Sequence, residues 1–217
     1  MEFLPSETYC CYGRVDTKNS SDGISNYLVT LADDSQINLK VTNGNELVLG
    51  NVYSFTFECR FNGTRNSYIL IKEKDIFECQ LNEDVYEVFK KFFPYVSIGI
   101  PALEEKLDKY LSNIANPTIK AICEDIFNRY RHDFLIYPAA VKMHHNYLGG
   151  LAYHTLTMCD LASAFAGFYD CVDCDLLIAG ALLHDVAKVI EFKAPTESEY
   201  SIKGQLIGHL VLGAIEI

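Results

Sequence analysis

The alternation of apolar and polar residues changes its period near residue 80 of the chain. Before this point apolar residues recur at every second position, and turn-forming residues separate the short runs, which is typical of strands. Residues 52–59 alternate strictly, and Asp33-Asp34-Ser35 predicts the turn of a hairpin. The predicted strands lie at residues 9–15, 27–31, 37–41, 52–59 and 68–71. Five short strands in a segment of this length predict an OB-like β-barrel.

From Asn82 onward the apolar residues recur with the period of a helix. Asn82 predicts an N-cap, Pro94 predicts a helix end, and Asn116-Pro117 predicts the start of another helix. The predicted helices lie at residues 83–93, 102–114, 117–131, 150–168, 175–190 and 203–217. We therefore expect an α+β chain of two domains, an OB-like barrel followed by an all-α bundle. The expected divisions are a barrel at 1–80, a helical connector at 81–145 and a helical domain at 146–217.

The chain is acidic, with 18 Lys and Arg against 29 Asp and Glu and a net charge of −11. This balance argues against a protein that binds nucleic acid through its overall charge. Any polyanionic substrate must therefore be held by a local basic patch, a stacking surface or metal ions.

The sequence carries no feature of a secreted or membrane protein. Its start lacks basic residues followed by an apolar run, so we expect no signal peptide. The longest apolar run, residues 176–183, is too short to cross a bilayer. The eight cysteines have no regular spacing, which indicates reduced thiols in a soluble cytoplasmic protein. Cys171 and Cys174 have the spacing of a zinc ligand pair, but no second pair lies nearby, so we expect no zinc site there.

A histidine, an aspartate and a lysine lie close together at the end of the apolar segment 176–183. The apolar pattern predicts a buried helix, and such helices rarely carry these groups unless the groups satisfy one another. A divalent cation would be bound by the His184 imidazole and the Asp185 carboxylate, leaving Lys188 for a phosphate oxygen. The alternative is a buried ion pair between Asp185 and Lys188, beside a hydrogen-bonded histidine.

Two further histidines lie in similar apolar surroundings on other predicted helices. His154 follows Gly149-Gly150, and His209 follows Gly204 and Gly208, whose small size would allow close approach of another helix or a substrate. Histidines on separate buried helices indicate a shared ligand.

Three segments carry a family resemblance: GGLAYHTL at 149–156, LLIAGALLHDVAK at 176–188 and GQLIGH at 204–209. Together they resemble the HD superfamily of metal-dependent phosphohydrolases. Within it they look like the YhaM-type 3′–5′ exoribonucleases, which also carry an N-terminal OB fold. The resemblance is close from about residue 138 to the end and general over the barrel.

The resemblance implies roles for named residues. His154, His184 and Asp185 would be metal ligands, His209 would serve a second metal position, and Asp185 and Lys188 would act in catalysis. Such families complete the site with a downstream aspartate and often another histidine, and no residue here matches them. We therefore expect a chain that ends inside the domain, with a degenerate, weakly metal-binding member as the alternative.

Other candidate residues have competing interpretations. His132-Asp133 repeats the dipeptide near a predicted helix end and is expected to be structural. His144 and His145 match the family's His-His run and would contact substrate phosphate together with Lys188, or lie in a solvated helix start. The barrel residues that could bind nucleic acid are Arg14, Arg60, Arg65, Tyr53 and Phe61. The alternative for the two aromatic residues is a place in the core of the barrel.

The resemblance implies a 3′–5′ exoribonuclease that releases nucleoside monophosphates from single-stranded RNA or single-stranded DNA, with metal-activated water attacking phosphorus in line. Mixed nitrogen and oxygen ligands favour one or two ions of Mn²⁺ or Fe²⁺ over Mg²⁺, Co²⁺ or Zn²⁺. Two alternatives stay open: an HD-type nucleotide phosphohydrolase, and a non-catalytic nucleic-acid-binding module. The sequence also leaves the oligomeric state open, a homo-oligomer included.

Overall fold

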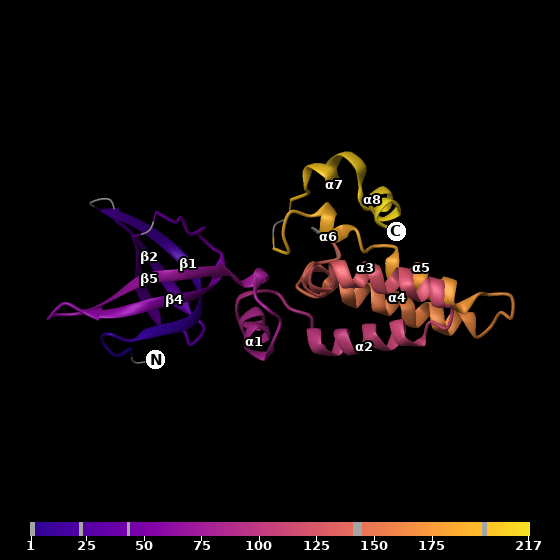
Figure 1. The fold of residues 1–217 in the computed structure, drawn as a ribbon, viewed down its shortest axis with the longest axis horizontal. Helices are drawn as coiled ribbons and strands as arrows, with labels where there is room; N and C mark the ends of the chain where they lie inside the picture. The colour runs from indigo at the N-terminus through magenta and orange to yellow at the C-terminus, as the bar shows by residue number, and fades with distance from the viewer. Residues whose placement is uncertain (1–2, 22–23, 43, 141–144, 197–198) are drawn as a thin grey trace. The chain divides into compact units, whose positions relative to one another are not determined.

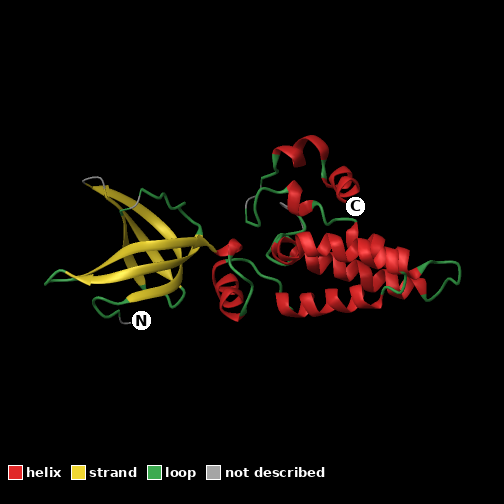
Figure 2. Ribbon diagram, in the orientation of Figure 1, coloured by secondary structure: helices red, strands yellow, loops and turns green. Residues whose placement is uncertain are grey.

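The computed structural model describes residues 3–21, 24–42, 44–140, 145–196 and 199–217. The chain divides into two compact units, Met1–Phe92 and Phe93–Ile217 (Figure 1). The first unit is a barrel followed by a short 3-10 helix and an α-helix, and the second is built of helices joined by loops (Figure 2). The expected α+β class, with a barrel followed by a helical bundle, is therefore confirmed.

The first unit contains a closed barrel of five strands. The strands are β1 Thr8–Ser21, β2 Ile24–Leu31, β3 Gln36–Val41, β4 Val52–Phe61 and β5 Asn66–Asp75. They pair in the order β1-β2-β3-β5-β4, and β4 closes the barrel by pairing with β1. The short β3–β5 pairing is parallel, and the other pairings are antiparallel. All five predicted strands are present, with β1 longer than its apolar pattern predicts.

Alternate residues of each strand fill the barrel interior, as period-two patterning requires. On β4, Phe55, Phe57 and Cys59 are fully buried. Phe3 packs edge-to-face on the rings of Phe57 and Tyr68, with centroids 5.3 and 5.4 Å apart. Most aromatic residues of the strands therefore stabilise the core.

Helix α1, Glu83–Phe92, belongs to the barrel unit. The Asn82 side chain accepts a hydrogen bond of 3.0 Å from the Val85 backbone N–H, so it is the predicted N-cap. The Phe89 ring stacks on Phe77 of the short 3-10 helix η1, Ile76–Glu78, with centroids 5.5 Å apart. The boundary between the two units thus falls after this helix, whereas the change of sequence period falls before it.

Seven helices form the described part of the second unit. They are α2 Ile100–Asn113, α3 Pro117–Ile136, α4 Gly150–Ala166, α5 Cys174–Leu183, α6 Lys188–Glu191, α7 Ile202–Ile207 and α8 His209–Glu216. The Asn116 side chain caps α3 by accepting from the backbone N–H groups of Thr118 and Ile119. Helix α3 continues five residues past its predicted end because Phe134, Leu135 and Ile136 are buried. Among the described residues, no helix is long and apolar enough to cross a membrane.

The predicted helix at 175–190 is wrong in its continuity. Helix α5 ends at Leu183, and residues 184–187 form a turn before α6 begins at Lys188. The backbone there makes i→i+3 hydrogen bonds, from Val186 to Leu183 and from Lys188 to Asp185. Such bonds are those of a tighter 3-10 turn, which periodicity of apolar residues does not reveal. The segment is also less buried than expected, since Leu176 is 62% exposed.

The predicted helix at 203–217 is also wrong in its continuity. It breaks at Gly208, whose φ of 77° lies in the left-handed region that favours glycine. His209 is therefore the first residue of α8 and does not lie inside a longer helix. The expected close approach occurs at Gly204, where an added Cβ would lie 2.2 Å from the Glu191 carbonyl oxygen. An added Cβ at Gly208 would meet nothing within 4 Å.

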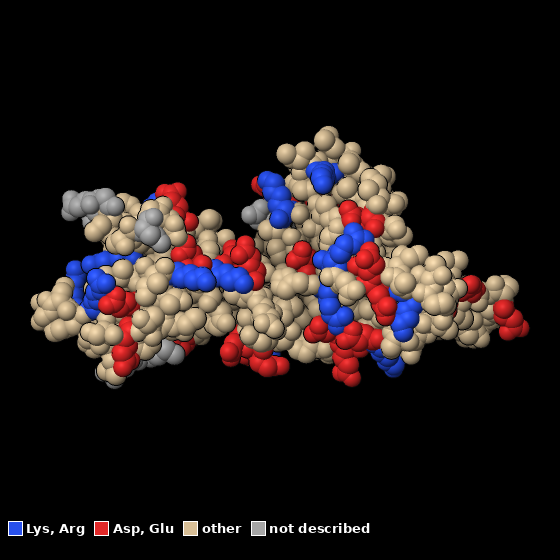
Figure 3. Space-filling model, in the orientation of Figure 1, with Lys and Arg blue, Asp and Glu red and all other residues tan. Residues whose placement is uncertain are grey.

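Acidic and basic side chains lie next to each other over the helical unit (Figure 3). Arg131 on α3 pairs with Glu104 at 3.0 Å and Asp108 at 2.7 Å on α2. Lys106 on α2 pairs with Asp160 on α4. Exposed pairs of this kind each contribute little to stability, so the buried apolar faces hold the bundle together.

Two glycines of the helical unit predict opposite effects on its stability. Gly180 lies inside α5 with open space where a Cβ would stand, so Gly180→Ala should raise the free energy of unfolding by about 0.5–1 kcal/mol. At Gly150 an added Cβ would lie 2.1 Å from the His145 carbonyl oxygen. Gly150→Ala should therefore lower the free energy of unfolding by roughly 1–3 kcal/mol. Urea denaturation of both variants measures the two shifts; shifts of the same sign would contradict the packing described for α4 and α5.

Candidate metal centre

Helix α4 and the turn after α5 bring two imidazoles to one carboxylate. The His154 Nε2 atom lies 3.5 Å from Asp185 Oδ2, and the His184 Nε2 atom lies 3.2 Å from the same oxygen. One ligand atom from each of the three residues lies within 4.8 Å of the others. Helices α4 and α5 pack against each other, which is why residues thirty positions apart in the sequence meet.

His209 approaches the same carboxylate from its other oxygen. Its Nε2 atom lies 3.4 Å from Asp185 Oδ1, while His154 and His184 lie beside Oδ2. The carboxylate of Asp185 therefore lies between two imidazoles on one side and one on the other, and the three imidazoles come from three separate segments of the chain.

Asp185 is an ionised carboxylate in a buried position, with only 5% of its surface exposed. Burial opposes its ionisation, but hydrogen bonds from His184 and Lys188 outweigh burial and hold the pKa of the carboxyl well below its usual range. Lys188 Nζ donates to Asp185 Oδ2 at 2.7 Å. The ion pair between Asp185 and Lys188 that the sequence suggested as an alternative is thus present within the same cluster.

The tautomer of His184 is fixed by the backbone. Its Nδ1 atom lies 2.8 Å from the Ala181 carbonyl oxygen, which can only accept, so Nδ1 carries a hydrogen and Nε2 faces Asp185. The hydrogen bond to Asp185 raises the pKa of His184. Burial is the largest influence on His154 and lowers its pKa, so this imidazole is neutral near pH 7 and offers a lone pair.

The start of α4 is held closely, which fixes the position of His154. Gly149 has a φ of 82°, and a Cβ on Gly150 would lie 2.1 Å from the His145 carbonyl oxygen. His145 itself has a φ of 65°, its Nδ1 atom lies 2.7 Å from the Tyr147 hydroxyl, and its ring centroid lies 5.8 Å from that of His154. His145 is therefore next to the cluster, whereas His144 lies outside the described residues.

The cluster fits a divalent ion by geometry and by chemistry. Two ligands bound side by side to one ion at about 2.1 Å lie roughly 3.0–3.4 Å apart. The separations of 3.2 and 3.5 Å at Asp185 Oδ2 are close to this range, and the ligand atoms of His154, His184 and Asp185 all lie within 4.8 Å of one another. Metal ligands must also be deprotonated. The ionised Asp185 and the neutral His154 meet that condition. The hydrogen bond to Asp185 favours the protonated form of His184, so His184 would release that proton on binding an ion.

Glu191, the last residue of α6, is not among the site residues predicted from the sequence. Only 7% of its surface is exposed, and both of its carboxylate oxygens lie 3.0 Å from His209 Nδ1. The available signal was its position on a helix of apolar residues three places after Lys188, where a solvated carboxylate is unusual.

Two apolar grooves adjoin His184. One, of about 420 Å³, lies between α3, α5 and α8, and the other, of about 930 Å³, lies between α4 and α5. Leu176 and Gly180 line both grooves. The polar cluster is therefore bordered by apolar surface on two sides, which limits the charged groups that can reach His184 from there.

The structure places the predicted nucleic-acid-binding residues of the barrel in different environments. Tyr53 is buried, and its hydroxyl accepts from the Val48 N–H, whereas Phe61 is 55% exposed. Arg14 pairs with Asp16 at 2.9 Å, and Arg60 pairs with Glu58 at 2.7 Å. Arg65 lines a polar groove on the barrel.

The groove that Arg65 lines has a volume of about 540 Å³ and crosses the end of β1, β2, β3 and the start of β5. We call it the amide groove because five of its described lining residues are Asn or Gln. Its lining is Asn19, Ser20, Asn26, Gln36, Ile37, Asn38, Lys40, Arg65, Asn66, Ser67 and Tyr68. Among the described residues no carboxylate lines it, although the chain as a whole carries a net charge of −11.

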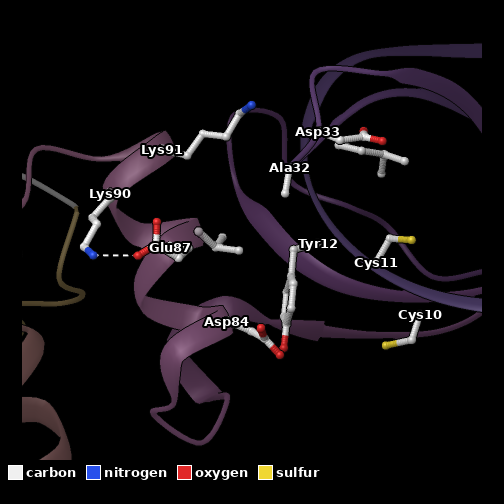
Figure 4. A pocket seen from close by; sticks show the side chains of 11 residues that line it. Cys10, Cys11, Tyr12, Ala32, Asp33, Asp84, Glu87, Lys90 and Lys91 are labelled. Atoms are coloured by element: carbon white, nitrogen blue, oxygen red, sulfur yellow. Dashed lines mark hydrogen bonds and ion pairs between the residues drawn. The ribbon is translucent and has the colours of Figure 1, made fainter. Parts of the chain in front are cut away.

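Another hollow, of about 630 Å³, lies between β1 and α1 (Figure 4). Tyr12 points toward Asp84 across it, and Lys90 pairs with Glu87 on its rim at 2.6 Å. Burial raises the pKa of the Cys11 thiol, which keeps it protonated and weakly nucleophilic. The described lining of this hollow contains no imidazole, so it does not bring imidazoles to a carboxylate in the way that the Asp185 cluster does.

The remaining sequence candidates lie away from the cluster. His132 Nδ1 lies 3.1 Å from a carboxylate oxygen of Asp133, its neighbour in the sequence. Cys171 and Cys174 are exposed free thiols. Within the described parts of the chain, neither pair belongs to a group of three or more potential metal ligands.

A comparison with known families agrees with this geometry. Residues 151–217 match the family model described as HD domain. His154, His184, Asp185 and His209 all lie inside the matched segment. HD domains are typically metal-dependent hydrolases, and such a domain implies binding of a divalent metal, with which the cluster is compatible. Residues 151–217 are therefore similar to an HD domain, and the first unit of the chain is an OB-like barrel.

Proposed function

We propose that this protein is a metal-dependent phosphodiesterase that shortens single-stranded RNA from the 3′ end and releases nucleoside monophosphates. The observation that carries the proposal is the convergence of His154, His184 and Asp185 inside a segment that matches the HD domain. Such a segment typically belongs to a metal-dependent hydrolase. The preference for RNA rests on the resemblance to YhaM-type enzymes and on the amide groove of the barrel.

Each residue of the cluster has a role that follows from its position. His154 and His184 would hold a divalent ion through Nε2, and Asp185 would contribute an oxygen to it. Mixed nitrogen and oxygen ligands favour Mn²⁺ or Fe²⁺. The ion, when bound, supplies Lewis-acid activation and neutralises charge at the phosphorus. His209, on the other oxygen of Asp185, would serve a second ion.

Lys188 and His145 would bind the substrate phosphate. The Lys188 side chain is 15% exposed and its ammonium lies 2.7 Å from Asp185, so it can reach a phosphate oxygen held beside that carboxylate. The ring of His145 lies next to that of His154 and carries a hydrogen-bonding nitrogen. Both groups would orient the scissile phosphate and add positive charge around it.

The amide groove supports a single-stranded polyanion as the partner of the barrel. Lys40 and Arg65 supply positive charge, and within the described chain neither pairs with a carboxylate. Amides and hydroxyls can donate to phosphate and sugar oxygens, and Tyr68 offers part of an aromatic ring. A local patch of this kind answers the conflict between an acidic chain and a polyanionic substrate.

The metal assignment predicts that His184→Ala abolishes uptake of Mn²⁺, because one of three clustered donors is removed. His132→Ala is the matched control, since His132 lies beside its neighbouring aspartate and stands outside the cluster. Elemental analysis of dialysed protein measures bound metal in both variants. Equal metal content in the two would refute the assignment.

The reaction is tested by incubating the protein with Mn²⁺ and a 5′-labelled RNA oligomer. We expect a ladder of labelled products that shortens from the 3′ end, and loss of the ladder when the metal is chelated. Intact oligomer together with hydrolysed mononucleotides would favour the nucleotide phosphohydrolase instead. RNA that binds but stays intact would favour a non-catalytic binding module.

The amide groove predicts a charge-dependent effect on binding. A protein with both Lys40→Gln and Arg65→Gln should bind single-stranded RNA more weakly in chelator, because two cations leave the groove. The slope of log affinity against log salt should fall by about 0.7 for each phosphate that the variant no longer neutralises. Arg60→Gln is the control, since Arg60 pairs with Glu58 and does not line the groove. Fluorescence anisotropy measures both, and an equal effect of the control would place the RNA elsewhere on the barrel.

A further inference from the structure

Glu191 is a buried carboxylate that the roles assigned above do not use. It ends α6 with 7% of its surface exposed, where an unpartnered charge would be strongly destabilising. The described hydrogen-bond partners of its carboxylate are the backbone N–H and the ring Nδ1 of His209. Oε1 accepts from the His209 backbone N–H at 3.1 Å, and both carboxylate oxygens lie 3.0 Å from His209 Nδ1.

We propose that Glu191 is the positioning residue of His209: it holds the imidazole in the tautomer with hydrogen on Nδ1 and directs the Nε2 lone pair toward Asp185. This inference rests on the metal centre proposed above, because it assigns the orientation of one of its ligands. Glu191 itself would touch neither ion nor substrate.

The tautomer follows from the chemistry of the two partners. A carboxylate can only accept hydrogen bonds, so the ring nitrogen beside it must be the donor. The other ring nitrogen, Nε2, is then left with a lone pair, and it lies 3.4 Å from Asp185 Oδ1. A carboxylate behind a metal-binding imidazole also fixes the orientation of its ring.

The surroundings of Glu191 keep it in place. The Ser201 backbone N–H donates to the Glu191 carbonyl oxygen at 2.8 Å, and the Ser201 hydroxyl donates to the Ile190 carbonyl oxygen at 2.7 Å. Gly204 lies so close to that Glu191 carbonyl that a Cβ would stand 2.2 Å away. Helices α6 and α7 therefore form one closely packed support on which α8 begins.

The far end of α8 is also fixed. Glu216 accepts from the Arg129 guanidinium at 2.7 Å and from the Tyr130 hydroxyl at 2.6 Å, both on α3. With its last turn held on α3 and its first residue held by Glu191, α8 has little freedom to rotate. The direction of the His209 ring is thus determined at both ends of a helix of eight residues.

A simpler interpretation is that Glu191 only caps α8. Its Oε1 does accept from the first backbone N–H of that helix, and Gly208 has no side chain to do so. A cap requires one oxygen on the backbone, however, and the second oxygen here also lies at hydrogen-bond distance from the ring. The two interpretations differ in whether removing the charge changes the imidazole.

The experiment compares wild type with Glu191→Gln, and with Glu199→Gln as a matched control, since Glu199 is an exposed partner of Lys193 in the same region. Nitrogen-15 NMR of the metal-free protein should show His209 with hydrogen on Nδ1 in wild type and control, and a mixture of tautomers in Glu191→Gln. Calorimetric titration with Mn²⁺ alone should show roughly 10- to 100-fold weaker binding for Glu191→Gln and no change for the control. In a His209→Ala background, Glu191→Gln should add no further loss.

Three results would overturn the proposal. They are a wild-type His209 with its hydrogen on Nε2, an unchanged tautomer and Mn²⁺ affinity in Glu191→Gln, and an equal loss of affinity with and without His209. The wild-type tautomer needs no substitution, so it decides the question even if Glu191→Gln unfolds the helical unit. Because no RNA is used, a wild type that binds no Mn²⁺ would refute the metal centre of the proposed function, while the tautomer still tests Glu191 separately.

Discussion

The helical unit is organised around one ionised carboxylate that is almost fully removed from solvent. Asp185 receives His154 and His184 on one oxygen and His209 on the other, and Lys188 adds an ammonium. Buried charge on this scale is tolerated only where several partners compensate it. Each partner comes from a different turn or helix, so the arrangement of α4, α6 and α8 is tied to a single side chain. The packing of the unit and its chemistry therefore depend on the same atoms.

In the proposed function, the two units would have different tasks according to their surfaces. The helical unit gathers nitrogen and oxygen ligands where they can hold a cation, and the barrel offers a groove of amides and two cations without a described carboxylate. Neither surface alone indicates degradation of a strand. In the proposed function, phosphate is bound in the barrel by neutral donors and a few cations, and it is cleaved in the helical unit by concentrated charge.

Much of the fold could be predicted from the sequence, because its signals were local. Period-two patterning in β4 and the caps Asn82 and Asn116 are local features, and they indicated the elements closely. The breaks after α5 and at Gly208 could not be predicted. Apolar residues keep the helical period through a 3-10 turn and through a glycine of positive φ, so periodicity does not reveal either break. The exposure of Leu176 was likewise hidden, because hydropathy does not tell whether another element covers a face.

The candidate site divides in the same way. Histidine and aspartate in apolar segments stood out against their surroundings, whereas the only signal for Glu191 was the short apolar run before it. The amide groove had no pattern at all, since Asn26, Asn38 and Asn66 come from three strands and meet only through their pairing. Sites made of neutral polar residues on a sheet are therefore found from structure more readily than from sequence.

The closeness of Gly204 to the backbone of α6 has a consequence for how mutational screens of this protein would be interpreted. Only a hydrogen atom fits against the carbonyl oxygen there, so any larger residue displaces the segment that leads to His209, five positions further along. Such a variant would score like the loss of a catalytic group, although the glycine contributes no reactive atom. The failure of substitutions at Gly204 would reflect the short distance between two backbone segments. A screen that identifies active-site residues by their intolerance to substitution would wrongly include this glycine.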